Sequence, residues 1–131
     1  MAIEGVVNAL REVHRVLVPG GLLVDTQPIS PRSAVLADGA LLGRLDMREW
    51  RAVVDDVEEQ VQRALAGGLF ALDAERSLMV SETFDNGPEC VETVAGWRGT
   101  TISARLARRV AAAPPPLRVD QEVRLRVLRA V

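Results

Sequence analysis

The sequence predicts an α/β fold built as a single domain over residues 1–131. Its 131 residues are 48% hydrophobic and 26% charged, which suits one globular domain and leaves little room for two. An amphipathic helical pattern opens the chain, a short apolar run follows a glycine turn, and a pattern of alternating polarity closes it. We therefore expect about three main strands, one of the parallel type and an antiparallel C-terminal strand, with a hairpin and three helices.

The first helix is expected before Pro19, because hydrophobic residues recur there at helical spacing. Pro19-Gly20-Gly21 ends it, since proline cannot continue a helix and glycine adopts backbone angles that other residues resist. Leu22-Leu23-Val24 then forms a continuous apolar run, typical of a parallel strand that is buried on both faces. The residues that mark the helical face are Ile3, Val6, Val7, Leu10, Val13 and Leu17.

The middle of the chain predicts a hairpin and a second helix. Asp38-Gly39 lies between two short apolar runs, which is a hairpin signal. Asp46, three residues before Glu49, resembles a capping box with Asp46 as the cap, and it precedes a helical pattern over 47–66. Gly67-Gly68 closes this helix.

The last third predicts a strand, a helix and a second strand. Residues 78–84 alternate in polarity, and Pro88 suits the first turn of a helix over 88–112 that Gly99 bends or interrupts. The final strand covers 117–128, where odd positions such as Leu117 and Val127 are apolar and the even positions from Arg118 to Arg126 are polar. One face of this strand should be buried and the other wet, which suits antiparallel pairing.

Composition excludes several classes of function. All sixteen basic residues are arginine, so Schiff-base chemistry and a lysine general base are ruled out. The net charge of -2 gives no field that would gather nucleic acid. No apolar run approaches the roughly 18 residues of a membrane span, and the single cysteine, Cys90, suits a reducing compartment. We expect a cytoplasmic protein without nucleic-acid or membrane partners.

One segment carries a family resemblance. Residues 9–24 read A-L-R-E-V-H-R-V-L-V-P-G-G-L-L-V, and from Leu10 to Val24 they resemble the signature L-R-E-x-x-R-V-L-x-P-G-G-x-L of class I S-adenosylmethionine-dependent methyltransferases. In that family the signature covers the helix before the fifth strand, a turn, and the fifth strand. The resemblance implies that 47–66, 78–84, 88–112 and 117–128 are the last helix, sixth strand, helix and seventh strand of a partial Rossmann-like sheet. It places the seventh strand antiparallel between the fifth and the sixth.

The same resemblance implies an incomplete enzyme. The family holds S-adenosylmethionine mainly with a glycine-rich loop and other residues upstream of the matched segment, and Gly20-Gly21 and Gly67-Gly68 do not form a G-x-G-x-x-G loop. We expect a truncated C-terminal part with substrate-side elements, inactive alone, with no catalytic or cofactor-binding residue, no metal site and no bound cofactor. Its partner would be a separate N-terminal half. The alternative is a non-catalytic homodimeric interaction module.

The candidate site residues are Asp25, Thr26 and Gln27, which follow the apolar run of the first predicted strand. Ligands of open α/β sheets bind at the carboxyl ends of the strands, so these residues are substrate-cleft candidates. A hydrogen-bonded strand end is the competing interpretation, and a ligand site at a dimer cleft is a third. His14 and Cys90 lack partners at readable spacing and are interpreted as structural.

The resemblance also predicts self-association. Without the family's fourth strand, the strand at 22–25 becomes an edge with an uncovered apolar face. We expect a homo-oligomer, a dimer with this strand or the helix at 2–17 in its interface.

Overall fold

The computed structural model describes residues 3–131 and divides the chain into two compact units. Unit 1 contains the described residues of segments 1–27, 52–78 and 124–131, and unit 2 contains Pro28–Arg51 and Met79–Val123. Four elements contribute residues to both units, because the second helix, the two longest strands and the last residue of the first strand, Pro28, cross the boundary. The mixed α/β class that the sequence predicts is confirmed.

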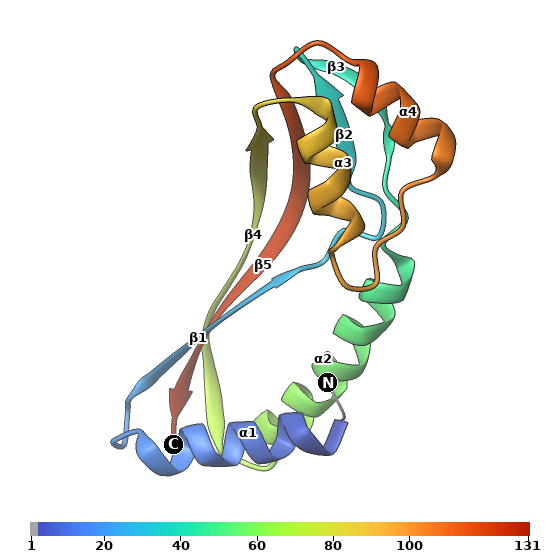
Figure 1. Ribbon diagram of the computed structural model, residues 1–131. Helices are drawn as coiled ribbons and strands as arrows, with labels where there is room; N and C mark the ends of the chain where they lie inside the picture. Colours follow the sequence, from blue (N-terminus) through green and yellow to red (C-terminus); the bar gives the residue numbers. More distant parts are fainter. Residues whose placement is uncertain (1–2) are drawn as a thin grey trace. The chain divides into compact units, whose positions relative to one another are not determined.

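The described residues form a five-stranded antiparallel sheet and four helices (Figure 1). Hydrogen-bonded neighbours follow the order β1-β5-β2-β3, and β4 pairs with β5. The strands are β1 (Leu22–Pro28), β2 (Ala34–Ala37), β3 (Ala40–Arg44), β4 (Phe70–Phe84) and β5 (Leu117–Ala130). The helices are α1 (Ile3–Val16), α2 (Arg48–Ala66), α3 (Gly87–Ala95) and α4 (Ala104–Ala112), and none of these described helices is long and apolar enough to cross a membrane.

The long strand β5 pairs with both β1 and β4. The amide of Ala130 donates to the carbonyl of Gly21, and the amide of Ile29 donates to the carbonyl of Glu122. Residue numbers therefore decrease along β5 as they increase along β1, which shows that the two strands are antiparallel. The amide of Val131 donates to Leu69 on the other side. Among the described strands, β1 therefore has β5 as its only partner.

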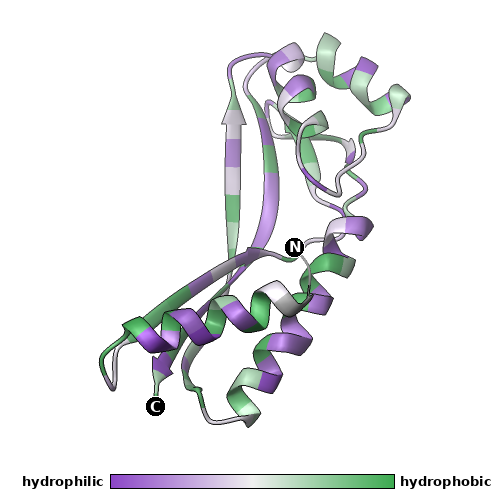
Figure 2. Cartoon of the chain, turned by 60° about the horizontal axis from the view of Figure 1, so that its bottom comes forward, coloured by the Kyte–Doolittle hydropathy of each residue, from purple (hydrophilic) through white to green (hydrophobic). Residues whose placement is uncertain are grey.

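Unit 1 buries one face of α1 and of α2 against the ends of β4 and β5. Hydrophobic and hydrophilic residues alternate along α1 in Figure 2, as its amphipathic pattern requires. Helix α1 contributes Val6 and Leu10 to this core. The other members of the core are Val61, Phe70, Leu128 and Ala130.

Unit 2 builds its core from the hairpin, α3, α4 and the first half of β5. Asp38 and Gly39 both have positive φ, 48° and 80°, as the tight turn of a two-residue hairpin requires, so the predicted hairpin is confirmed. Strand β2 pairs with β5 through Val35 and Val119. Val35, Val94, Val110, Leu117 and Val119 are fully buried there.

Several element predictions need correction. The helix expected over 88–112 is two helices, α3 and α4, because a loop around Gly99 separates them. The strand expected over 78–84 extends back to Phe70; its first half is rich in alanine and charged residues, which hides a strand from pattern analysis.

The run at Leu22–Val24 is a strand, but the expectation that it is buried on both faces is wrong. Leu22 is 56% exposed and Val24 is 58% exposed, while Leu23 packs on the core of unit 1. Its pairing is antiparallel, not the predicted parallel type, because its described partner is β5.

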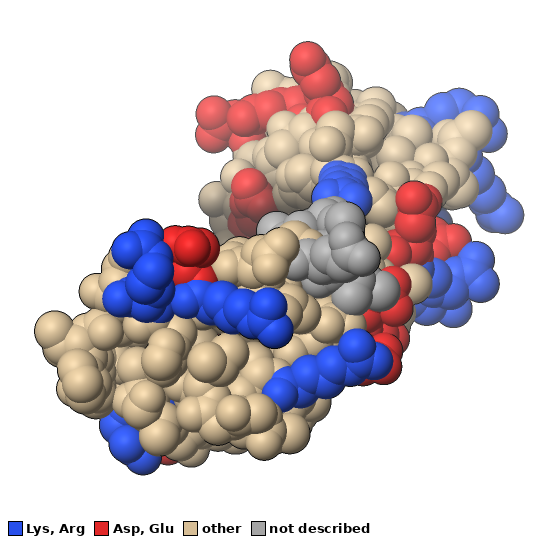
Figure 3. All heavy atoms as spheres, turned by 90° about the horizontal axis from the view of Figure 1, so that it is seen from below, with Lys and Arg blue, Asp and Glu red and all other residues tan. Residues whose placement is uncertain are grey.

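Viewed from the α1 end, the surface carries arginines and carboxylates around an area without charged residues (Figure 3).

The burial of β5 also departs from the prediction. Odd positions Leu117 and Val119 are buried in unit 2, as expected. In unit 1 the buried positions are the even ones, Arg126, Leu128 and Ala130, because these face the core shared with α1 and α2. The result is an arginine whose side chain is 1% exposed.

Candidate functional site

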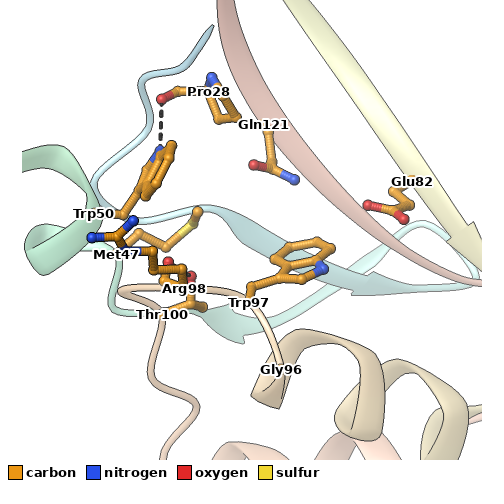
Figure 4. A pocket seen from close by; sticks show the side chains of 9 residues that line it. All are labelled: Pro28, Met47, Trp50, Glu82, Gly96, Trp97, Arg98, Thr100 and Gln121. Atoms are coloured by element: carbon orange, nitrogen blue, oxygen red, sulfur yellow. Dashed lines mark hydrogen bonds between the residues drawn. The ribbon is translucent and has the colours of Figure 1, made fainter. Parts of the chain in front are cut away.

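A pocket of about 370 Å³ in unit 2 is lined by both tryptophans of the sequence. Figure 4 shows Trp50 and Trp97 on opposite sides of the space. Pro28 at the end of β1 and Glu82 near the end of β4 also line it, so the pocket lies at the carboxyl ends of these two strands. The remaining lining residues are Met47, Gly96, Arg98, Thr100 and Gln121.

Trp50 is held in place from two directions. Its indole Nε1 donates a hydrogen bond of 3.0 Å to the carbonyl of Pro28. Its backbone amide donates a hydrogen bond of 3.2 Å to the carbonyl of Gly99. The ring also packs on the core of unit 2, so this wall of the pocket is preorganised.

Trp97 sits on the loop after α3, and backbone hydrogen bonds fix that loop. The amide of Trp97 donates to Val94, and the amide of Thr100 donates back to Trp97. Two further hydrogen bonds join Asp46 and Thr101 in an antiparallel bridge. Because the loop is tied to the segment before α2, the two tryptophan walls are coupled.

Gly99 permits this close approach. Its φ is +67°, and a Cβ atom at this position would lie 2.6 Å from the backbone nitrogen of Trp50. Only glycine satisfies both conditions without strain.

Three polar side chains of the pocket have no hydrogen-bond or ion-pair partner within the described chain. No hydrogen bond or ion pair joins the side chains of Glu82, Gln121 or Arg98 to any other residue among 3–131. Glu82 and Gln121 approach on the side of Trp97, whereas Arg98 lies on the side of Trp50 (Figure 4). The pocket thus offers a carboxylate, an amide and a guanidinium around largely apolar walls.

Asp46 contacts the first residue of α2. Its Oδ1 accepts hydrogen bonds from the backbone amide and Nε of Arg48, and its Oδ2 lies 2.7 Å from Nη2 of the same arginine. These hydrogen bonds lower the pKa of Asp46 to about 2. The predicted capping box between Asp46 and Glu49 is not what these contacts show, because α2 begins at Arg48 and Asp46 accepts from the amide of Arg48, two residues on.

The structure places the predicted residues Asp25, Thr26 and Gln27 outside the pocket, in unit 1. The Asp25 carboxylate lies 3.0 Å from Nη2 of the buried Arg126. Gln27 accepts a hydrogen bond of 3.0 Å from Arg124. Thr26 points to the exposed side of β1.

Glu58 of α2 completes a charged cluster with these arginines. Its Oε2 lies 2.5 Å from Nη1 of Arg126 and 3.0 Å from Nη2 of Arg124; these are ion pairs without the alignment of a hydrogen bond. A buried guanidinium needs such compensation because desolvation of a charge is costly. The arrangement gives Asp25 and Gln27 partners inside the fold.

Cys90 and His14 occupy structural positions, as interpreted from the sequence. Cys90 is fully buried in α3, and burial, aided by the charges of Glu82 and Glu89, raises the pKa of its thiol to about 11. His14 Nε2 lies 3.1 Å from the carbonyl of Val131, and its ring meets Phe70 edge to face.

The glycine pairs do not form a cradle for S-adenosylmethionine. A Cβ on Gly21 would lie 2.9 Å from the carbonyl of Val18, so this turn is filled by the residues that directly follow α1. Gly68 has a φ of +78° and lies two residues after the end of α2, as the left-handed glycine of a helix C-cap does. Neither glycine pair therefore fits this cofactor. Among the described residues no group of three or more metal-ligating side chains occurs.

No protein-family model matches the chain, and no curated protein matches it in sequence. The pocket was missed at the level of sequence, although one signal was present: the only two tryptophans of an aromatic-poor chain line it together.

Proposed function

We propose that this chain is the C-terminal, substrate-side part of an S-adenosylmethionine-dependent methyltransferase with a Rossmann-like sheet. One observation carries the proposal: β5 lies between β1 and β4 and is antiparallel to β1. The resemblance of residues 9–24 implies this order for the segments 22–24, 117–128 and 78–84. Composition and periodicity alone did not require it.

The position of the tryptophan pocket supports the same proposal. It opens at the carboxyl ends of β1 and β4, where open α/β sheets bind ligands. In a methyltransferase the protein acts mainly by positioning donor and acceptor in line. The residues of this chain would bind and orient the acceptor, whereas the cofactor would be held by a separate N-terminal half. In this proposal the protein is cytoplasmic, with Cys90 as a free thiol.

The test is a calorimetric titration with S-adenosylhomocysteine. We expect no saturable heat from the folded 131-residue chain, since its glycines form no cofactor cradle. The DNA upstream in the same frame, or a neighbouring gene, should encode a strand followed by a glycine-rich loop, and the two halves together should bind the ligand. Saturable heat from this chain alone, or no binding by the combined halves, would overturn the proposal.

A non-catalytic homodimeric interaction module is the second candidate. It is favoured by the place of β1 at one end of the strand order and by the exposure of Leu22 and Val24. Edge strands with apolar side chains pair readily with another chain.

A further inference from the structure

We propose that the pocket between Trp50 and Trp97 binds a small organic amine, with its ammonium group toward Glu82 and Trp97 and its apolar body against Trp50, Met47 and Pro28. Binding of the amine needs no cofactor and stands on the pocket alone. Its identity as the methyl acceptor rests on the proposed function.

The walls of the pocket favour a cation at one end. Indole faces are the strongest aromatic partners for a positive charge, because their π electrons present a negative surface. Trp97 shares its side of the pocket with the Glu82 carboxylate and the Gln121 amide (Figure 4). Both polar side chains lack hydrogen-bond and ion-pair partners among the described residues, so their oxygens can accept hydrogen bonds from an ammonium group.

The opposite side of the pocket favours an apolar body of limited length. Met47 and Pro28 add a thioether and a ring to the face of Trp50, and such surfaces gain free energy when they are removed from water. Arg98 lies on this side (Figure 4) and would repel a second positive charge there. The arrangement therefore selects a monoamine with a compact hydrophobic group.

The preorganised geometry supports binding. Trp50 is fixed by Pro28, and the loop of Trp97 is fixed by Gly99 and the Asp46–Thr101 bridge. A pocket whose walls are already in place loses little conformational entropy when a ligand enters. Three further pockets of unit 2, each lined by one or more of Arg32, Arg44 and Arg48, have no aromatic residue in their lining.

The experiment uses three probes with one phenyl body and different charge: 2-phenylethylamine, 3-phenylpropionate and 2-phenylethanol. The chain has no tyrosine and its two tryptophans both line the pocket, so fluorescence excited at the red edge of tryptophan absorption reports on this site alone. Calorimetry provides a second readout. We expect saturable binding of the amine, with the anion and the alcohol weaker by about fivefold or more, as expected for a cation held by an aromatic face and a carboxylate.

Two variants test the residues. Glu82→Gln should weaken binding of the amine by about fivefold. Glu75 is an exposed carboxylate on the same strand but outside the pocket, so Glu75→Gln should leave the affinity for the amine unchanged. Trp97→Leu should abolish amine binding measured by calorimetry. Equal or tighter binding of the anion or the alcohol, or no binding of the amine by either readout, would overturn the inference. None of these outcomes depends on S-adenosylhomocysteine, so the proposed function is tested separately.

Discussion

At the scale of single residues, a substitution of Asp25 tests whether this carboxylate stabilises the fold or serves a substrate. Its carboxylate pairs with an arginine that is 1% exposed, and removing one partner of a buried ion pair leaves an uncompensated charge. Because Arg126 would keep Glu58, we expect Asp25→Ala to lower the free energy of unfolding by about 2 kcal/mol. Chemical denaturation measures this change.

The neighbouring Thr26 provides the matched control. It is exposed on the opposite side of β1, so Thr26→Ala should change stability by no more than about 0.5 kcal/mol. If Asp25→Ala were as neutral as its control, the charged cluster would not stabilise unit 1. Asp25 would then be free to serve a ligand, as the sequence first indicated.

At the scale of elements, the loop between α3 and α4 forms one wall of the pocket, and Gly99 allows this loop to pack closely against Trp50. Gly99→Ala would face both a positive φ and a backbone nitrogen 2.6 Å from the new Cβ. We expect a loss of about 2–3 kcal/mol in unfolding free energy and weaker amine binding, measured by denaturation and by tryptophan fluorescence. Gly39→Ala has a similar φ of +80° with nothing within 4 Å, so it should cost about 1 kcal/mol and leave binding intact. Equal effects of the two changes would show that the contact with Trp50 is unimportant.

The elements also show which parts of the fold sequence patterns can predict. Helix periodicity located α1 and α2 closely, and Asp38-Gly39 located the hairpin, because these signals are local. The first half of β4 was missed because its conformation depends on pairing with β5, a contact distant in sequence. The same limit applies to Arg126: alternation predicted a wet side chain, and only tertiary packing brings Asp25 and Glu58 to it.

The candidate site shows the same contrast between local signals and contacts distant in sequence. The sequence pointed to Asp25, Thr26 and Gln27 near the carboxyl end of the first strand, whereas the pocket is lined by Pro28, directly after them, and by none of the three. Its walls come from segments around 47–50, 82, 96–100 and 121. No local spacing joins these segments, so the pocket could be recognised only once the chain was folded.

At the scale of the whole molecule, the terminal strand β1 exposes an apolar surface that a further strand would cover. Leu22 and Val24 are each more than half exposed, and β1 ends the strand order. An N-terminal half would supply the next strand in the proposed enzyme, whereas a second copy of this chain would do so in the interaction module. Both solutions remove the same apolar surface and the same free backbone groups from water.

The two solutions differ in the oligomeric state of the isolated chain, which light scattering measures at micromolar concentration. We expect a dimer that Val24→Lys weakens by about tenfold or more, because a charged side chain on an edge strand opposes pairing. Leu41→Lys, at a residue of similar exposure on β3 in unit 2, should leave the dimer intact. A monomer with well-dispersed amide resonances would contradict the interaction module. If that monomer then bound a separately expressed N-terminal half, and Val24→Lys prevented the binding, the edge of β1 would be the interface between the two halves of the proposed methyltransferase.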